Sequence, residues 1–280
     1  MPNPATLPDG NTFTGDEGCR LCEGPLVQKF SLVVLHKYEV RYFECDRCGS
    51  LQTEFPYWLD DAYSSNLSKL DTGAVQRNLQ NLSAAYLVSK IFGVSNALDF
   101  GGGDGLLCRL LRDYNVNCYV KDRYAVPTYG QGFSEPDFVT PNLVLAFEVF
   151  EHFATPAREL EDLFQLRPMV LLASTEIYSH QSADWWYLAS ESGQHLFFYS
   201  EKALHMIAVQ FGYTYLLSGG FVLFVRKPDN SGLKAFLAKF LLSRVVCRLL
   251  RGLILIMPAP GAWRDHLSAK SKPSKTGAVS

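Results

Sequence analysis

The stretch ALDFGGGDGLLCRLL, residues 97–111, places a glycine-rich corner between two apolar segments. Its apolar spacing predicts a strand, Asn96–Phe100, before the corner and a helix, Leu106–Tyr114, after it. Glycine in a regular element costs about 0.5–1 kcal/mol of stability relative to alanine. A corner with four glycines therefore indicates that a ligand approaches the backbone closely at the N-terminus of the helix.

Acidic residues surround this corner. Asp122 ends a second predicted strand, Asn117–Lys121, at the position where doubly wound sheets hold the ribose hydroxyls of a nucleoside. Dinucleotide fingerprints have the pattern GxGxxG, but Leu106 occupies the sixth position here. Asp99 and Asp104 add negative charge where a pyrophosphate would lie. The pattern therefore favours a nucleoside-bearing cofactor with a positively charged centre.

Periodic apolar segments continue on both sides of the corner. A predicted helix over 73–92 precedes it, with Gly93 placed to end that helix. Asp71–Gly73, with Arg77 and Asn78, would cap this helix or form the rim of a ligand site. A shorter helix is expected around 57–67. The pattern downstream predicts strands over 143–147 and 169–173, a helix over 201–212, and an antiparallel pair over 213–217 and 220–226. The expected fold class is α/β, with a Rossmann-like sheet and helices on both faces.

The composition is that of an ordinary globular protein. The chain has 280 residues, 48% of them hydrophobic, and a formal net charge of −2. Nucleic-acid-binding proteins normally carry a basic patch, so this balance argues against a nucleic-acid partner. The N-terminal residues lack the basic flank and apolar core of a signal peptide, which predicts a cytoplasmic location. Seven cysteines, an odd number, are not expected to form a disulfide framework.

Two CxxC motifs stand near the N-terminus, separated by a segment, Leu26–Phe43, whose alternation predicts a β-hairpin. Four thiolates at this spacing can form a tetrahedral structural metal site, and a metal stabilises a segment too small for a core of its own. The spacing predicts a zinc ribbon and leaves open iron, a redox-active pair or two unrelated turns. The remaining cysteines are predicted to be buried hydrophobic residues. The predicted zinc ligands are Cys19, Cys22, Cys45 and Cys48.

Three pieces occur in order along the chain: LDFGGGDG at 98–105, Asp122 after the second strand, and FEVFEH at 147–152 after a further strand. This combination resembles the class I S-adenosylmethionine-dependent methyltransferases. The resemblance covers residues 84–227 approximately and implies S-adenosylmethionine as cofactor and methyl transfer as activity. Because a sulfonium already carries a good leaving group, positioning supplies much of the acceleration.

The resemblance also assigns roles to single residues. Asp99, Gly101 and Gly103 would face the methionine portion of the cofactor, and Asp122 would hold its ribose. Arg123 and Tyr124 would flank the adenine. Asp99 has an alternative role as an acceptor of backbone hydrogen bonds, and Arg123 as a solvated surface residue. The full set of predicted cofactor contacts is Asp99, Gly101, Gly103, Asp104, Asp122, Arg123, Phe147 and Glu148, the last two near the sulfonium.

A catalytic base is needed only if the methyl acceptor must lose a proton, and histidine suits that task near neutral pH. His195 is the first candidate, because it lies in a polar insertion that we expect to cover the substrate. His152 is the second candidate, with packing as its alternative role, and His180 is the third. Glu151 and Glu176 are expected to orient an imidazole or to bind a hydroxyl group.

The segment WWYLA at 185–189, with the following ESGQH and FYS, is similar to bacterial methyltransferases encoded beside glycosyltransferases. The CxxC pair resembles the zinc ribbon of sugar methyltransferases. Together they imply a sugar-like methyl acceptor, such as a glycan or nucleotide-sugar intermediate of surface polysaccharide or secondary metabolite biosynthesis. The aromatic triplet would form a sugar-binding wall or pack in the core. Two alternatives are a zinc-ribbon RNA methyltransferase and a non-catalytic adaptor that recruits partners to a membrane.

Residues 233–257, LKAFLAKFLLSRVVCRLLRGLILIM, form a long apolar segment with five lysine and arginine residues. Charges at this frequency argue against a transmembrane span and favour a basic amphipathic helix. We expect this helix to contact a membrane surface, to bind a glycosyltransferase or second subunit, or to pack on the chain itself. Membrane contact would place the protein at the inner face of the membrane.

Changes in composition along the chain predict its organisation. The turn-rich PDNSG at 228–232 separates the sheet from the apolar helix, and polar residues follow Pro258. The predicted segments are a disordered arm (1–15), the zinc ribbon (16–55), a helical linker or lid (56–95), the methyltransferase domain (96–228), the amphipathic helix (229–257) and a disordered tail (258–280).

Overall fold

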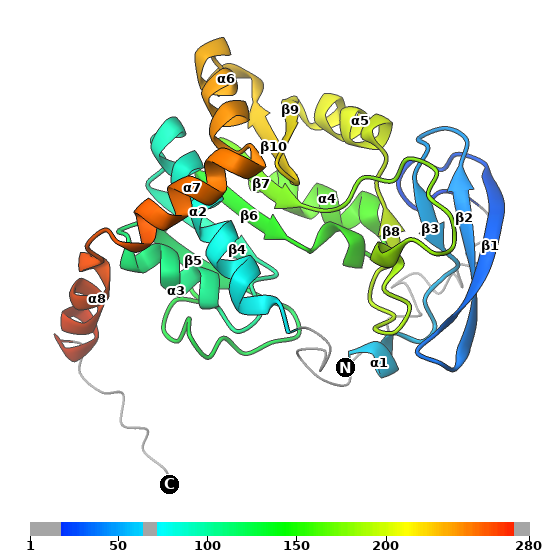
Figure 1. Ribbon diagram of the computed structural model, residues 1–280, viewed down its shortest axis with the longest axis horizontal. Coiled ribbons are helices and arrows are strands. Elements are labelled where there is room, and N and C mark those ends of the chain that lie inside the picture. Colours follow the sequence, from blue (N-terminus) through cyan, green and yellow to red (C-terminus); the bar gives the residue numbers. More distant parts are fainter. Residues whose placement is uncertain (1–17, 64–71, 272–280) are drawn as a thin grey trace, which may run out of the picture.

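The computed structural model describes residues 18–63 and 72–271 and contains two sheets (Figure 1). The larger sheet has the strand order β5-β4-β6-β7-β10-β9, with the first four strands parallel and β10 antiparallel to both neighbours. The chain proceeds from β4 to β5 on one side and then returns to β6 on the other side of β4. Such a reversal opens a crevice between β4 and β6 at their carboxyl ends. The predicted strands of this sheet are confirmed as β4 (Asn96–Phe100), β5 (Asn117–Lys121), β6 (Leu143–Phe147), β7 (Val170–Ser174), β9 (Tyr213–Ser218) and β10 (Phe221–Arg226).

Helices cover both faces of the larger sheet (Figure 1). α2 (Ala74–Phe92) and α3 (Leu106–Asp113) pack through one hydrophobic cluster, and α4 (Pro156–Gln165) and α5 (Glu201–Phe211) pack through another. Alternate side chains of β6 enter the two clusters, because successive residues of a strand point to opposite faces. The expected Rossmann-like fold with helices on both faces is therefore confirmed.

The smaller sheet has the order β1-β2-β3-β8 and joins distant parts of the chain. β1 (Leu26–Val34) and β2 (Tyr38–Cys45) form the predicted hairpin, and β3 (Leu51–Thr53) pairs with β2. β8 (Phe197–Phe198) follows β7 in the chain and pairs with β3. The ribbon predicted over 16–55 is therefore not a unit of its own, because its sheet is completed by a strand from the larger domain.

Arg20 ties the first CxxC motif to this shared sheet. Its guanidinium donates hydrogen bonds to the carbonyl oxygens of Thr53 (3.0 Å), Leu196 (2.8 Å) and Ala154 (3.2 Å). The side chain is only 8% exposed, and burial lowers the pKa of Arg20 to about 10. A buried cation that is hydrogen-bonded to three carbonyls fixes the ribbon against the segment that leads into β8.

The linker predicted over 56–95 contains two helices within the described residues. α1 (Leu59–Ala62) is shorter than the helix expected around 57–67, of which residues 64–67 lie outside the described part. α2 begins after Gly73, and no side chain caps its first turn in the described residues. Asp71 lies outside the described residues, so its role as a cap stays a prediction. Gly93 ends α2 in the left-handed conformation, with φ 68°, as predicted.

The amphipathic helix expected over 229–257 is broken in two. α6 (Gly232–Leu241) and α7 (Arg244–Leu255) are separate helices, both on the face of the larger sheet that carries α2. A Cβ on Gly219, in the β9–β10 turn, would lie 2.0 Å from the carbonyl oxygen of Leu242. The chain between α6 and α7 therefore rests directly on that turn.

The tail predicted to be disordered over 258–280 contains α8 (Pro260–Ser271), so the prediction is wrong for these residues. Asp265 is 7% exposed, and its carboxylate accepts hydrogen bonds from Arg112 (2.7 and 2.9 Å) and Arg109 (2.8 Å) of α3. These arginines hold the pKa of Asp265 below its usual range against the effect of burial. Composition did not reveal this long-range ion pair. The arm predicted over 1–15 lies outside the described residues.

Among the described helices, none is by itself long and apolar enough to cross a membrane. α7 and α8 pass the same test only when taken together as a pair bent by 54°.

Candidate functional site

The glycine corner between β4 and α3 forms an open backbone surface. A Cβ on Gly102 would lie 2.4 Å from Oδ2 of Asp99, so the corner has no space for a side chain there. Residues Gly101–Gly105, together with Asp99 and Asp122, are called the glycine cradle below. Three of its glycines adopt left-handed conformations that other residues rarely adopt: Gly101 (φ 69°), Gly103 (φ 54°) and Gly105 (φ 77°).

Asp122 lies directly beside the corner, although it follows β5. Its Oδ2 accepts a hydrogen bond from the backbone N–H of Gly103 (2.9 Å). Its Oδ1 accepts from the N–H groups of Tyr124 (2.7 Å) and Ala125 (2.8 Å). The carboxylate therefore shapes the turn around the cofactor crevice, and its contact with a ribose stays a prediction.

Asp99 is only 2% exposed and lies under the corner, where the backbone N–H of Cys108 bonds to its carboxylate. Burial, helped by the charge of Asp122, raises the pKa of Asp99 to about 7. Its Oδ2 has no hydrogen-bond partner. An open glycine turn over an unpartnered carboxylate oxygen fits a nucleoside cofactor with a positively charged centre.

Three other predicted cofactor contacts lie around the same crevice. The side chain of Asp104 is exposed, whereas Phe147 is half-buried and packs edge-on against Phe221 with ring centroids 5.9 Å apart. Arg123 is exposed, and its guanidinium carbon lies 5.6 Å from the ring centre of Tyr124. The adenine contact of Arg123 stays a prediction, beside its alternative as a surface residue.

Glu148, at the end of β6, has an unusual backbone. Its φ of 53° lies in the left-handed region, which costs energy for a residue with a side chain. Ser174 at the end of β7 stabilises this conformation, because its hydroxyl donates to Oε1 of Glu148 (2.7 Å) and accepts from the Glu148 N–H (3.1 Å). The two strand ends therefore hold the Glu148 carboxylate in one place.

The structure brings the three predicted catalytic residues together. Ligand-capable atoms of Glu151, His152 and His195 all lie within 4.8 Å of one another, and this group is called the glutamate–histidine cluster. Burial raises the pKa of Glu151 well above its usual range. It lowers the pKa of His152 to about 3 and also lowers that of His195. Both imidazoles are therefore neutral at neutral pH, and each is a weak base on its own.

The structure does not bring His180 into this cluster. Its imidazole is 72% exposed, and Nδ1 lies 3.0 Å from Oε2 of Glu44 on β2. Of the aromatic residues at 185–187, expected to form a sugar-binding wall or to pack in the core, one is buried and one is exposed. Tyr187 is 1% exposed and donates to Oε1 of Glu151 (2.7 Å), Trp185 is half-buried, and Trp186 is 72% exposed.

A pocket of about 350 Å³ opens at the carboxyl ends of β6 and β7, and it is called the arginine pocket. Glu148 and Glu176 line it from these strand ends, and Trp186 lines it from the insertion. Other lining residues come from the N-terminal part of α2, the β9–β10 turn and one face of α7. Its four arginines are Arg77, Arg244, Arg248 and Arg251.

Sequence comparison agrees with this geometry. The family described as "Methyltransferase domain" matches residues 69–218, which is more than half of the chain. The chain belongs to this methyltransferase family. It is an S-adenosylmethionine-dependent methyltransferase, and the enzyme interpretation is favoured over the adaptor. Among curated proteins, none matches the chain significantly.

Several solved structures have similar folds. The methyltransferase domain of bacterial CtHen1 is 18% identical, over 53% of this chain and 97% of that one, with a TM-score of 0.39. The magnesium protoporphyrin IX methyltransferase of Synechocystis with bound SAH is 16% identical, over 60% and 92%, with a TM-score of 0.41. The mitomycin 7-O-methyltransferase MmcR is 15% identical, over 53% and 53%, with a TM-score of 0.35.

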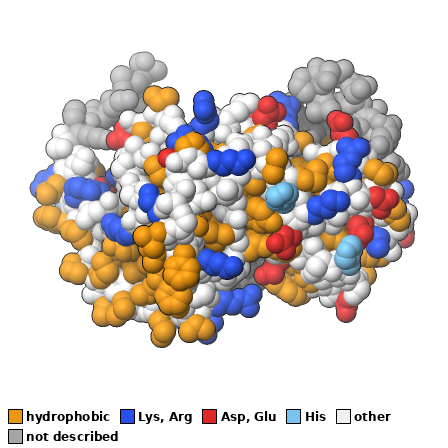
Figure 2. Space-filling view, turned by 90° about the horizontal axis from the view of Figure 1, so that it is seen from above, with side chains coloured by type: hydrophobic (Ala, Val, Ile, Leu, Met, Phe, Trp, Pro, Cys, Tyr) orange, Lys and Arg blue, Asp and Glu red, His pale blue; other side chains and the backbone are white. Residues whose placement is uncertain are grey.

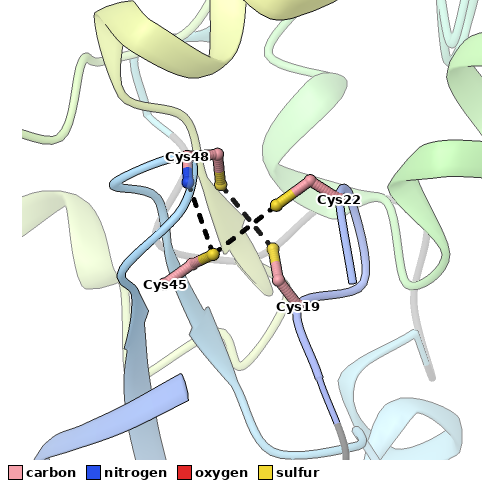
Figure 3. A group of neighbouring side chains, drawn as sticks. All are labelled: Cys19, Cys22, Cys45 and Cys48. Carbon is pink, nitrogen blue, oxygen red and sulfur yellow. Dashed lines mark hydrogen bonds between the residues drawn. The ribbon is translucent and has the colours of Figure 1, made fainter. Parts of the chain in front are cut away.

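The four cysteines of the two CxxC motifs converge at the edge of the methyltransferase (Figure 3). Their sulfur atoms all lie within 4.8 Å of one another, with Cys19–Cys48 at 3.7 Å and Cys22–Cys45 at 3.5 Å. A tetrahedral ion with Zn–S bonds of about 2.3 Å places its sulfurs about 3.8 Å apart. The backbone N–H of Cys48 also points at the Cys45 sulfur (3.4 Å). This donor set, called the cysteine cluster, fits zinc.

Sequence reasoning missed several residues of the methyltransferase site. Tyr63 was not singled out, yet its hydroxyl lies 2.8 Å from Nδ1 of His152. The arginines of α7 were assigned only to an amphipathic helix, although their spacing places them on one helical face. That spacing was the available signal, but only the packing of α7 on α2 turns this face toward the strand ends.

Proposed function

We propose that this methyltransferase modifies a small, anionic, sugar-like acceptor, such as a sugar phosphate or nucleotide sugar. The observation that carries the proposal is the arginine pocket, which lies beside the strand end where Glu148 stands. In open α/β sheets, ligands bind at the carboxyl ends of the strands near the reversal of strand order. A methyl acceptor in the arginine pocket would therefore lie next to the glycine cradle.

The charges of the pocket support an anionic group on the acceptor. Among the residues that the structure describes, Arg244, Arg248 and Arg251 form no ion pair with a carboxylate. Guanidinium groups bind phosphate oxygens through paired hydrogen bonds. Three such groups along one face of α7 suit a phosphate or diphosphate better than a neutral sugar.

The opposite wall of the pocket supports a sugar-like acceptor. The carboxylates of Glu148 and Glu176 can accept hydrogen bonds from hydroxyl groups. Trp186 exposes 72% of its surface and offers an aromatic face for stacking. Activation of the attacking group takes place at the neighbouring glutamate–histidine cluster, which Tyr187 links to the pocket through its hydroxyl, 2.7 Å from Glu151 and 3.3 Å from Glu148.

A panel of acceptors tests this function. Purified protein is incubated with S-adenosylmethionine and with nucleoside-diphosphate sugars, sugar phosphates or the matching neutral sugars, and S-adenosylhomocysteine release is measured. We expect turnover with the phosphorylated compounds and much less with the neutral sugars. Equal turnover with both groups would contradict an anionic acceptor, and turnover with RNA alone would favour the RNA methyltransferase.

The cysteine cluster holds a structural zinc ion in this proposal. Its four sulfurs are mostly buried, so no coordination position is open to a substrate. Metal analysis of the purified protein should give zinc, and Cys45→Ser should remove one zinc ion per chain and lower the melting temperature. Loss of iron in place of zinc in Cys45→Ser, or no loss of metal, would contradict the zinc assignment. Cys247→Ser, at a buried cysteine outside the cluster, is the matched control.

The outer face of α6, α7 and α8 docks on an anionic membrane surface in this proposal. Figure 2 shows hydrophobic side chains gathered on the half of the molecule that carries these helices. On α7, Val245, Leu249 and Leu253 are 71%, 68% and 57% exposed. Lys234, Lys239, Arg264 and Lys270 of these helices lie outside the arginine pocket, and the one acidic residue, Asp265, is buried. Apolar residues with a positive surround suit a negatively charged bilayer.

Vesicle flotation tests the membrane surface. The protein should float with vesicles that contain phosphatidylglycerol and less with pure phosphatidylcholine. The double variant Leu249→Gln/Leu253→Gln should lose flotation, whereas Val209→Gln, at an exposed apolar residue on α5, should keep it. Flotation that is unchanged in the double variant would contradict docking through α7.

A further inference from the structure

The glutamate–histidine cluster combines two imidazoles with one carboxylate at the mouth of the crevice. Glu151 and His152 belong to the short 3-10 helix η1 (Phe150–His152) after β6, and His195 comes from the segment before β8. The two imidazole rings are 5.0 Å apart and nearly perpendicular, at 75°. Glu151 is fully buried and both histidines are half-buried. The cluster is therefore closed on the protein side and open on the other.

The hydrogen bonds of the histidines leave one ring nitrogen of each available. Nδ1 of His195 lies 2.7 Å from the carbonyl oxygen of Tyr187, so Nδ1 carries the proton and Nε2 has a free lone pair. Nδ1 of His152 lies 2.8 Å from the hydroxyl of Tyr63, which leaves its Nε2 without a protein partner among the described residues. A second partner that orients the imidazole through its other nitrogen is typical of metal-binding histidines.

Glu151 provides a separate observation. Its side chain is 0% exposed, and Oε1 accepts a hydrogen bond from Tyr187 (2.7 Å). Its Oε2 is buried and has no hydrogen-bond partner. A buried carboxylate oxygen without a hydrogen-bond partner destabilises the folded protein. A bound cation would remove this destabilisation.

We propose that Glu151, His152 and His195 bind a divalent transition-metal ion. Two imidazoles and one carboxylate suit Mn²⁺, Fe²⁺, Co²⁺ or Zn²⁺ better than Mg²⁺, which prefers oxygen ligands. Three protein ligands leave coordination positions open, in contrast to the closed cysteine cluster.

The location gives this ion a role that rests on the proposed function. An acceptor hydroxyl in the arginine pocket would bind at an open position, and the ion would lower the pKa of that hydroxyl. The hydroxyl proton leaves to solvent, the oxygen forms a bond to the methyl carbon, and the electron pair of the broken C–S bond stays on sulfur. Neither histidine then has to accept the proton itself, because both are bound to the ion. Binding of the ion does not depend on this role.

Titration with Mn²⁺ tests the site directly. The full-length protein, with zinc at the cysteine cluster and with the glutamate–histidine cluster cleared of metal by brief chelation, is titrated with Mn²⁺, and the free ion is followed by electron paramagnetic resonance. Mn²⁺ has little affinity for thiolates, so the cysteine cluster does not interfere. We expect one Mn²⁺ per chain, at least tenfold weaker binding in Glu151→Gln and His195→Gln, and no change in His180→Gln, at an exposed histidine outside the cluster.

Glu151→Gln keeps the shape of a protonated carboxyl, which suits a buried residue, and circular dichroism melting checks that each variant folds. If Glu151→Gln does not fold, His195→Gln decides. The proposal is overturned if the wild-type protein binds no Mn²⁺, or if folded variants bind it as well as the wild type. Calorimetry with S-adenosylhomocysteine distinguishes a failure of the metal site from a failure of the methyltransferase function. Binding of that ligand without Mn²⁺ binding refutes the metal site and leaves the methyltransferase function intact.

Discussion

The glycine cradle and the arginine pocket lie at the same edge of the central sheet, but they are assembled over very different distances along the chain. The cradle comes from consecutive elements, β4, α3 and β5, and its form depends on backbone conformation. The pocket combines α2, three strand ends, a hairpin turn and α7. The difference suggests a fixed cofactor site beside an acceptor site that can change whenever the C-terminal helices change.

The largest effect is expected at Gly102. In Gly102→Ala, the new Cβ would lie 2.4 Å from Oδ2 of Asp99 and 2.8 Å from Val120. Overpacking of this kind destabilises a fold by about 1–3 kcal/mol unless the backbone shifts. If the cofactor has to restore the native corner when it binds, the same cost weakens its affinity about 5- to 150-fold. Calorimetry with S-adenosylhomocysteine should show this loss. Gly232→Ala at the start of α6 is the control, because open space surrounds that position and it lies outside the glycine cradle. Equal losses in both variants would contradict a tight corner.

A smaller loss is expected at Asp122. Asp122→Ala leaves the N–H groups of Gly103, Tyr124 and Ala125 without their acceptor and removes the predicted ribose contact. We expect about tenfold weaker binding of S-adenosylhomocysteine. The zinc content should not change, because the cysteine cluster lies in the other sheet. Unchanged affinity would refute the role of Asp122 in the cradle.

Arg248 tests the arginine pocket, the acceptor site of the comparison. Arg248→Gln should raise the KM for a phosphorylated acceptor about fivefold, since an exposed charge contributes about 1 kcal/mol. Cofactor affinity should stay the same. Lys239→Gln removes the same charge from the exposed side of α6 and should change neither quantity. A fall in cofactor affinity in Arg248→Gln would show that the two sites are not separate.

The smallest effect is expected at Asp99 and concerns the free energy of unfolding, because this side chain is buried under the corner. Burial raises the pKa of Asp99 from 3.8 to about 7, so the folded protein keeps a proton that the unfolded chain releases over this range. The free energy of unfolding should therefore fall as pH rises from about 4 to 7. Asp99→Asn should melt higher than the wild type at pH 8 and similarly at pH 4. A difference independent of pH would contradict the raised pKa.

Elements that form through contacts between neighbours in the chain were predicted well, and those that depend on contacts between distant residues were not. The strands β4, β5 and β6 were predicted at their observed bounds, because apolar periodicity is a local signal. β8 has only two residues and carries no periodicity, so its pairing with β3 was not predicted. α8 lies in a mostly polar segment that begins after Pro258, and the ion pairs of Asp265 with α3 hold it in place.

The candidate site divides in the same way. Glu151, His152 and His195 were each singled out, but as alternative bases or orienting groups. Their convergence within 4.8 Å depends on how the segment before β8 folds back over η1. Tyr63 was missed because a tyrosine just after a short helix has no distinctive pattern, and its contact with His152 exists only in the folded chain.

By itself, the sequence determined the α/β sheet, the glycine cradle and the pairing of two CxxC motifs, because periodicity, glycine content and short spacings act between neighbours in the chain. Only the tertiary structure decided that the ribbon shares its sheet with β8, that α7 lines a pocket, and that two histidines and a glutamate meet beside it. These contacts depend on which buried surfaces pack together, and side chains far apart in the chain meet only after that packing.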